Sequence, residues 1–248
     1  MSIHSVTVAY QNKPVLWDID FDTEGGKLTA IVGPNGAGKT TLIRASLELI
    51  PKVSGSVLFW GKSLDESRKR ISYMPQRESV DWNFPITVQE VVSMGRLGDV
   101  PWYKRLGRGD KLKISESIES VGLSEFKNRQ IKELSGGQQQ RVFIARALCQ
   151  DADLFFMDEP FSSIDAQTEK LIFASLDSLR KKGKTVVCVH HALTTVPKYF
   201  DNVLLLNKRV IASGSVQHIF NDENLAKTYG GNLTILEKVS HAIKETKL

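Results

Sequence analysis

The stretch of sequence that decides the fold reads Gly33-Pro34-Asn35-Gly36-Ala37-Gly38-Lys39-Thr40-Thr41. It fits the pattern G-x-x-x-x-G-K-[ST], which is typical of loops that bind the phosphates of a nucleotide. Its glycines let successive backbone N–H groups approach charged phosphate oxygens with no side chain in between. We predict that Lys39 reaches the β- and γ-phosphates and that Thr40 offers its hydroxyl to Mg²⁺. The helix that follows would direct its positive end at the phosphates.

The residues around this loop predict a strand before it, at 27–32, and a helix after it, at 41–45. Later in the chain, predicted strands alternate with predicted helices: strands at 71–74, 154–157 and 185–189, and helices at 138–148 and 167–182. Strands that alternate with helices are typical of an α/β protein with a parallel sheet, which binds nucleotide at the carboxyl ends of its strands.

Two regions depart from this alternation. Near the N-terminus, apolar residues at 6–10 and 15–21 predict a strand pair, and residues 56–62 predict a strand that turns into a hairpin. Between residues 85 and 135, apolar residues recur at helical spacing in two segments, which a glycine-rich and basic stretch at 95–109 separates; this predicts an inserted α-helical subdomain. Strands at 202–206 and 209–213 are expected to pair. We therefore predict a mixed sheet core, an N-terminal antiparallel β subdomain and the helical insertion, in one domain spanning 1–248 with a C-terminal tail at 231–248.

Composition narrows the class of protein. A chain of 248 residues, 41% hydrophobic, can bury a substantial core. Its apolar runs are far shorter than the roughly 18 residues that cross a bilayer, and the N-terminus has no signal-like segment, so we expect a cytosolic protein. Cys149 and Cys188 lie in apolar stretches and are interpreted as core residues of a reducing compartment. The net charge of +5 is divided among short clusters, which favours solvated charges over a nucleic-acid site and is compatible with an anionic membrane face.

A pair of acidic residues follows the predicted strand 154–157. Asp158 and Glu159 stand where a carboxylate can reach the Mg²⁺ of a phosphate loop from a neighbouring strand. We assign Asp158 to the Mg²⁺ shell through water and Glu159 to the attacking water, as a general base or polariser. The alternative is a helix cap or a salt bridge. Gln76, which follows the strand 71–74, could reach both the metal and the water.

A second anion site is predicted at Ser135-Gly136-Gly137-Gln138, which follows Leu134. A serine and two glycines that open a helix offer free N–H groups and a positive helix end. The chain therefore has two phosphate-type sites. They could serve two anions, or one anion from each of two copies of the protein.

Together these motifs resemble the ATP-binding subunit of an ATP-binding cassette (ABC) transporter. The resemblance covers roughly residues 3–230, with the motifs in the family's order. It implies the following roles: Tyr10 as the aromatic residue that stacks on adenine, Gly33–Thr41 as Walker A, Gln76 as the Q-loop, Leu134–Gln138 as the signature, Asp158 and Glu159 as Walker B, Ser162-Ser163-Ile164-Asp165 as the D-loop and His191 as the switch histidine that contacts the γ-phosphate.

The resemblance also implies an ATPase with Mg²⁺, in which two copies sandwich two ATP molecules. Ser135 and Gly137 would then complete the site of the partner copy. The sequence departs from the family at Ala192, where aspartate is frequent, and at Ile164, where leucine is usual. His190 and His191 are adjacent at the end of a predicted strand, so their side chains should point to opposite faces. We expect His191 to face the nucleotide and His190 to be packed or hydrogen-bonded beneath the sheet.

Other classes of protein fit less well. In a small-molecule kinase, the signature and Glu159 would have no role. A DNA-repair ATPase of the cassette type would carry a long coiled coil, and no such heptad run is present. A translation-factor protein would normally hold two cassettes in one chain, and a non-enzymatic nucleotide-binding module would not need both Glu159 and His191.

The cargo is indicated by resemblance alone. Residues 77–88, 94–96, 190–191 and 201–207 resemble the ATPases of manganese, zinc and iron uptake systems. In such a system the chain lies at the cytoplasmic face of the cell membrane, bound to membrane permease subunits, while an extracytoplasmic metal-binding protein selects the ion. A siderophore or other small-solute importer is the alternative. Trp82 and Phe84 are expected to contact the permease; the alternative is that one or both fill the core of the helical insertion.

Overall fold

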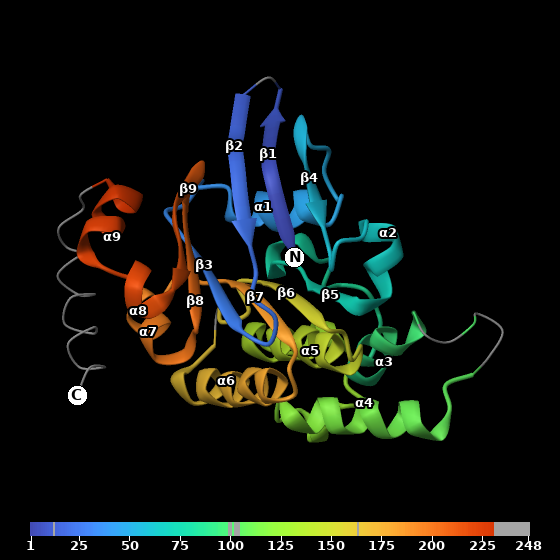
Figure 1. Ribbon diagram of the computed structural model, residues 1–248. Coiled ribbons are helices and arrows are strands. Elements are labelled where there is room, and N and C mark those ends of the chain that lie inside the picture. The colour runs from blue at the N-terminus through green and yellow to red at the C-terminus, as the bar shows by residue number, and fades with distance from the viewer. Residues whose placement is uncertain (12, 99–100, 102–104, 163, 231–248) are drawn as a thin grey trace. The chain divides into compact units, whose positions relative to one another are not determined.

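A computed structural model describes residues 1–248 except 12, 99–100, 102–104, 163 and 231–248 (Figure 1). The chain forms two compact units, which are described separately: Met1–Arg68 with Thr185–Leu248, and Lys69–Lys184. Two predictions lie outside the described residues, namely the C-terminal tail at 231–248 and Ser163 of the D-loop.

The first unit contains a three-stranded antiparallel sheet in the order β2-β1-β4 (Figure 1). Strand β1 (Ser2–Tyr10) pairs with β2 (Lys13–Asp22) on one edge and with β4 (Ser54–Leu58) on the other. The predicted N-terminal strand pair is thus confirmed. The strand predicted to turn into a hairpin over 56–62 is also confirmed, because β4 ends at Leu58 and Phe59 and Lys62 exchange two backbone hydrogen bonds of 2.8 and 3.0 Å that close a tight turn.

The same unit holds the strands that position the phosphate loop. Strand β3 (Leu28–Val32) pairs in parallel with both β7 (Thr185–Val189) and β8 (Asn202–Asn207), and β9 (Arg209–Ser215) is antiparallel to β8. All residues of β3 and β7 are buried, as their continuous apolar sequences require. The helices of this unit are α1 (Lys39–Ser46), α2 (Leu64–Ser67), α7 (Val196–Tyr199), α8 (Val216–Ile219) and α9 (Asp222–Tyr229).

The second unit contains two parallel strands, β5 (Ile71–Met74) and β6 (Leu154–Asp158). Its helices are α3 (Val88–Leu97), α4 (Arg108–Ser120), α5 (Gly136–Cys149) and α6 (Ala166–Lys181). The helices α3, α4 and α5 pack against one another in pairs (Figure 1). The predicted alternation of strands and helices, and with it the predicted α/β fold, is confirmed.

One predicted helix boundary, at Gly95, is wrong. The stretch 95–109 was expected to separate two helices, but α3 continues through Gly95 to Leu97. A Cβ atom added at Gly95 would lie 2.5 Å from the carbonyl oxygen of Arg146 on α5. The glycine therefore permits a close approach of two helices and does not end the helix.

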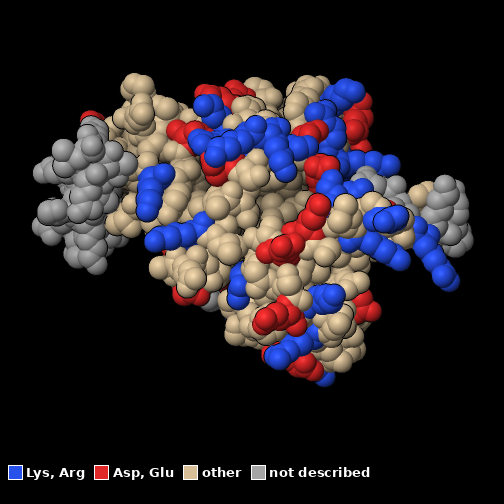
Figure 2. Space-filling view, turned by 90° about the horizontal axis from the view of Figure 1, so that it is seen from below, with Lys and Arg blue, Asp and Glu red and all other residues tan. Residues whose placement is uncertain are grey.

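The buried cysteines and the mixed charges of the surface agree with what the composition predicts. Cys149 and Cys188 are both buried, and burial raises the pKa of each thiol. On the face shown in Figure 2, basic side chains stand beside acidic ones. Two short basic clusters, at 68–70 and 180–182, contain ion pairs, such as Arg70 with Asp153 at 2.7 Å and Lys181 with Asp177 at 2.8 Å.

Candidate phosphate site and signature helix

The phosphate loop leaves β3 at Val32 and enters α1 at Lys39, as predicted. Its glycines are required for two different reasons. Gly36 and Gly38 have φ angles of +78° and +95°, which residues with a side chain rarely adopt. Gly33 is needed for space, because a Cβ atom there would lie 1.9 Å from the carbonyl oxygen of Leu206.

The side chain of Lys39 turns back into the loop. It is 6% exposed, and its Nζ donates hydrogen bonds to the carbonyl oxygens of Gly33 (2.9 Å) and Pro34 (3.0 Å). The first turn of α1 contains no acidic residue, so nothing in that turn offsets the positive helix end. The loop thus presents a held ammonium group and backbone N–H groups to an anion.

Tyr229, on α9, also belongs to this loop, and sequence reasoning missed it. Burial raises the pKa of Tyr229 to about 12, and the backbone of Gly33, which is near the hydroxyl, opposes this rise to a smaller extent. Next to it, Asn207 donates from Nδ2 to the carbonyl oxygen of Thr228 at 3.0 Å, which ties α9 to β8. A lone tyrosine in a helical segment carries no local signal for such a contact.

The two adjacent histidines are in different environments. His190 is 2% exposed, with its Nε2 atom 2.6 Å from Oγ1 of Thr195 and its ring 5.1 Å from that of Phe200. Burial, followed by the nearby charge of His191, lowers the pKa of His190 to about 4. His191 is exposed. The expectation that His190 is packed is confirmed, and the contact of His191 with the γ-phosphate stays a prediction. Tyr10, at the end of β1, is 45% exposed and could offer its ring to a base.

In the second unit, Asp158 is the last residue of β6 and Glu159 follows it directly. Asp158 is fully buried, whereas Glu159 is partly exposed and has a φ angle of +54°. Such an angle is uncommon for a residue other than glycine and is strained unless its surroundings hold it. Gln140, which is 1% exposed on α5, donates from Nε2 to the carbonyl oxygen of Glu159 at 2.8 Å. This bond from the signature helix helps to hold the turn.

The predicted signature forms the N-terminus of α5. Ser135 is the N-cap residue, and its Oγ accepts a hydrogen bond from the backbone N–H of Gln138 at 3.3 Å. In return, Oε1 of Gln138 accepts from the backbone N–H of Ser135 at 2.9 Å. This capping box fixes the turn and leaves the hydroxyl proton of Ser135 able to donate to an anion.

The D-loop aspartate has a structural role. Asp165 caps α6, because its Oδ1 accepts from the backbone N–H groups of Gln167 and Thr168, both at 2.9 Å. The backbone N–H and the hydroxyl of Thr168 are the main reasons that the pKa of Asp165 is lowered. Any contact between Asp165 and nucleotide stays a prediction. Gln76 lies directly after Pro75 and is partly exposed, in the position expected for the Q-loop.

The described residues contain no group of three or more His, Cys, Asp or Glu side chains that could cage a metal ion. Mg²⁺ needs no such cage, because it keeps several waters and binds one or two carboxylates together with substrate phosphates. The hard oxygen donors Thr40, Gln76 and Asp158 are of the type that Mg²⁺ prefers. The residues present therefore fit this ion.

Trp82 and Phe84 lie in different environments. Trp82 packs edge-on against Phe143 with ring centroids 5.0 Å apart, whereas Phe84 is 60% exposed. Trp82 thus fills space within its own unit, which agrees with the alternative weighed for it, and Phe84 is the aromatic residue open to a partner.

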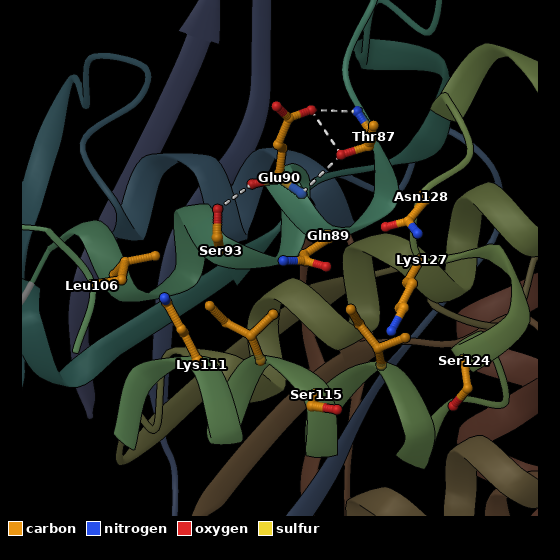
Figure 3. A pocket seen from close by; sticks show the side chains of 12 residues that line it. Thr87, Gln89, Glu90, Ser93, Leu106, Lys111, Ser115, Ser124, Lys127 and Asn128 are labelled. Carbon is orange, nitrogen blue, oxygen red and sulfur yellow. Dashed lines mark hydrogen bonds between the residues drawn. The ribbon is translucent and has the colours of Figure 1, made fainter. Parts of the chain in front are cut away.

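A pocket of about 430 Å³ lies between α3, α4 and the segment 124–128 (Figure 3). Ile114 and Ile118 are buried at its wall, and the amino groups of Lys111 and Lys127 point into it (Figure 3). Neither lysine forms an ion pair with any residue that the structure describes. The pocket therefore combines an apolar wall with two cationic groups and one acidic residue, Glu90, whose carboxylate accepts hydrogen bonds from Thr87.

Comparison with known proteins agrees with this arrangement. A family profile described as "ABC transporter" matches residues 16–162. The chain belongs to the ABC transporter family, whose ATP-binding subunits hydrolyse ATP. Among the residues that the structure describes, no helix is both long and apolar enough to cross a membrane.

Particular relatives are similar over nearly the whole chain. The zinc transport system ATP-binding protein TroB of Treponema pallidum is 52% identical, over 94% of this chain and 88% of that protein. The manganese transport system ATP-binding protein MntB of Bacillus subtilis is also 52% identical, over 96% of this chain and 95% of that protein. Among solved structures, a nucleotide-free ATP-binding cassette from an ABC transporter superposes with a TM-score of 0.75, at 25% identity, over 96% of this chain and 97% of that one.

Proposed function

We propose that this chain binds and hydrolyses ATP to drive import of a divalent metal ion through separate membrane subunits. The observation that carries this proposal is the identity of 52%, over more than nine-tenths of the chain, to ATP-binding proteins of a zinc and a manganese transport system. Iron is a further candidate cargo. A siderophore or another small solute is the alternative, because the cargo need never touch this chain.

In the proposed reaction, the phosphate loop binds and orients ATP. Lys39 places its positive charge at the β- and γ-phosphates, and Mg²⁺, held by Thr40 with Asp158 and Gln76 through water, would neutralise phosphate charge. Glu159 accepts a proton from the attacking water or polarises it. His191 contacts the γ-phosphate, and Tyr10 stacks on the adenine.

A second copy of the chain would complete each site. The N-terminus of α5, with Ser135 and Gly137, is an anion site without a role in a lone chain, and it would bind the γ-phosphate of the partner's ATP. The protein would act as a dimer at the cytoplasmic face of the membrane. An extracytoplasmic metal-binding protein would deliver the ion to the permease.

The permease is proposed to contact Phe84 and the pocket between α3 and α4. The exposed ring of Phe84 and the walls of Ile114 and Ile118 suit an apolar side chain, and Lys111 and Lys127 suit a carboxylate. A short permease segment that combines the two would match this surface.

The function is tested by uptake of radiolabelled Mn²⁺, Zn²⁺ and Fe²⁺ in cells whose own copy carries Lys39→Ala. We expect uptake of at least one of these ions to be lost. The matched control is Lys52→Ala, which removes a surface lysine paired with Glu48 at 3.4 Å. Normal uptake of all three ions, together with loss of another solute's import, would contradict the metal assignment and leave the ATPase assignment intact.

A further inference from the structure

Arg77 connects the segment after Gln76 with the first turn of α5. Its guanidinium lies against Gly136, where an added Cβ atom would be 3.2 Å from Cζ and 3.3 Å from Nη2. Its Nε and Nη2 atoms both donate to Oε1 of Gln139, at 3.2 and 2.8 Å. The arginine beside the predicted Q-loop residue is therefore bound to the helix that begins with the signature.

Gln139 extends this connection into the segment that precedes the signature. It is 5% exposed, and its Nε2 donates to the carbonyl oxygen of Ile131 at 3.0 Å. The two ends of its carboxamide are thus both used, the oxygen for Arg77 and the nitrogen for Ile131. Arg77 is linked to the chain on both sides of the signature turn.

Trp82 holds Arg77 from the other direction. Its Nε1 donates to the carbonyl oxygen of Arg77 at 2.9 Å, and its ring centroid lies 5.8 Å from the Arg77 Cζ. The same ring packs against Phe143, one turn further along α5 than Gln139. The segment from Gln76 to Trp82 is therefore attached to α5 at two successive turns.

The charge of Arg77 is unusual for this position. A cation is unfavourable near a helix N-terminus, and the first turn of α5 contains no acidic residue to compensate. An anion that approaches the Ser135 turn reverses this balance, because it interacts favourably with both the helix end and the guanidinium. A purely structural brace would not need a charged group here.

We propose that Arg77 is a positioning residue that makes Gln76 and the signature turn move as one element. This inference rests on the proposed function, in which Gln76 serves the ATP of its own chain and the signature serves the ATP of the partner. Arg77 would then couple the two nucleotide sites of the dimer, so that binding in one site sets the geometry that the other requires.

The test uses the Glu159→Gln variant, which is expected to accumulate as a dimer when ATP is added. Arg77→Met, Gln139→Leu and the double replacement are added to it, and dimer formation against ATP concentration is followed by size-exclusion chromatography. We expect each single change to raise the ATP concentration for half-dimerisation about tenfold, a size within the range for hydrogen bonds to a charged group. The double change should be no worse than either single change, and ATP affinity of the monomer should stay within about twofold.

Two further variants separate positioning from charge and from packing. Arg77→Lys keeps the charge and the fold but has no planar two-donor fork, so it should behave like Arg77→Met. Arg129→Met is the matched control, since it removes an arginine that lies over a ring, Phe126, elsewhere in the same unit. It should dimerise as the parent does.

Three results would overturn the coupling: parental dimerisation in Arg77→Met, additive effects in the double variant, or an equal defect in Arg129→Met. If Glu159→Gln protein with Arg77 intact stayed monomeric with ATP, the proposed sandwich would itself be wrong. That failure is distinguishable, because it is observed before Arg77 is changed.

Discussion

The Nε2 atom of Gln140 donates a hydrogen bond to the carbonyl oxygen of Glu159 across 2.8 Å. It joins the signature helix to the residue proposed to prepare the attacking water, whose φ angle is +54°. A backbone held in this uncommon region depends on its surroundings. Gln140 is therefore expected to affect catalysis although it touches no substrate.

Gln140→Leu removes this bond while nearly preserving the side-chain volume. We expect kcat to fall about tenfold and the free energy of unfolding to fall by about 1–3 kcal/mol, because a buried hydrogen bond is lost. ATP affinity should stay within twofold. Steady-state ATPase kinetics and urea unfolding measure these quantities.

The matched control for this change is Gln150→Leu. Gln150 follows the C-terminus of the same helix and donates from Nε2 to the carbonyl oxygen of Ile71 at 2.7 Å. It should lose stability to a similar extent but keep its kcat. An equal loss of kcat in both variants would show that general destabilisation explains the effect.

Glu159→Gln is expected to bind ATP normally and to lower kcat by orders of magnitude. An interaction made only in the transition state affects turnover and spares substrate binding. The variant should therefore accumulate as an ATP-bound dimer, detectable by size-exclusion chromatography. Glu125→Gln, an exposed residue of the same unit, serves as the control. Parental turnover by Glu159→Gln would remove Glu159 from its assigned role.

The buried imidazole of His190 should make the stability of the fold depend on pH. Burial lowers the pKa of this imidazole to about 4 from the usual value of 6.5. The unfolded chain therefore binds the proton more readily, so the stabilisation is complete above about pH 6.5 and is lost as the pH falls towards 4. At about 1.4 kcal/mol per pKa unit, the loss has an upper limit of about 3 kcal/mol.

Measuring Tm between about pH 7.5 and about pH 4.5 follows the loss of stability through most of this window. His190→Asn should be less stable at neutral pH and should show a flatter dependence on pH. The control His4→Gln changes an exposed histidine and should keep the parental slope. A parental slope in His190→Asn would assign the pH dependence to other groups.

The parts of this fold that the sequence predicted are those with local signals. The phosphate loop, the helix that opens after Ser135 and the buried strand β3 each follow from neighbouring residues. Gly95 misled because a glycine weakens a helix in isolation, and the helix that it contacts comes some fifty residues later in the chain. The contacts of Gln140, Arg77 and Tyr229 could not be predicted, because each joins segments far apart in sequence through one side chain.

Tyr229→Phe is expected to raise the KM for ATP about two- to fivefold and leave kcat unchanged. The hydroxyl is near the backbone of Gly33, and a single hydrogen bond of this kind contributes about 0.5–1.5 kcal/mol. Its loss loosens the phosphate loop before ATP binds and does not affect the chemical step. Tyr199→Phe, in the same unit, is the control. An unchanged KM would limit the role of Tyr229 to packing.

Phe84 and Trp82 should respond differently to truncation, because one ring is exposed and the other is packed. Phe84→Ala should keep the parental Tm and ATP affinity but weaken co-purification with the permease, since an exposed aromatic residue contributes to a partner interface when it becomes buried. Trp82→Ala removes the contacts with Phe143 and the hydrogen bond to Arg77, and should lower the free energy of unfolding by less than the roughly 3–5 kcal/mol expected for a fully buried tryptophan, because Trp82 is partly exposed.

Leu112→Ala is the matched control for the exposed ring, because Leu112 is 61% exposed on α4, in the same unit, and does not line the pocket. It should leave co-purification unchanged. Thermal unfolding and pull-down with detergent-solubilised permease separate the two effects. The proposed contact would be wrong if Phe84→Ala bound the permease normally and only folded Trp82→Ala protein lost permease binding. The contact would then be assigned to Trp82.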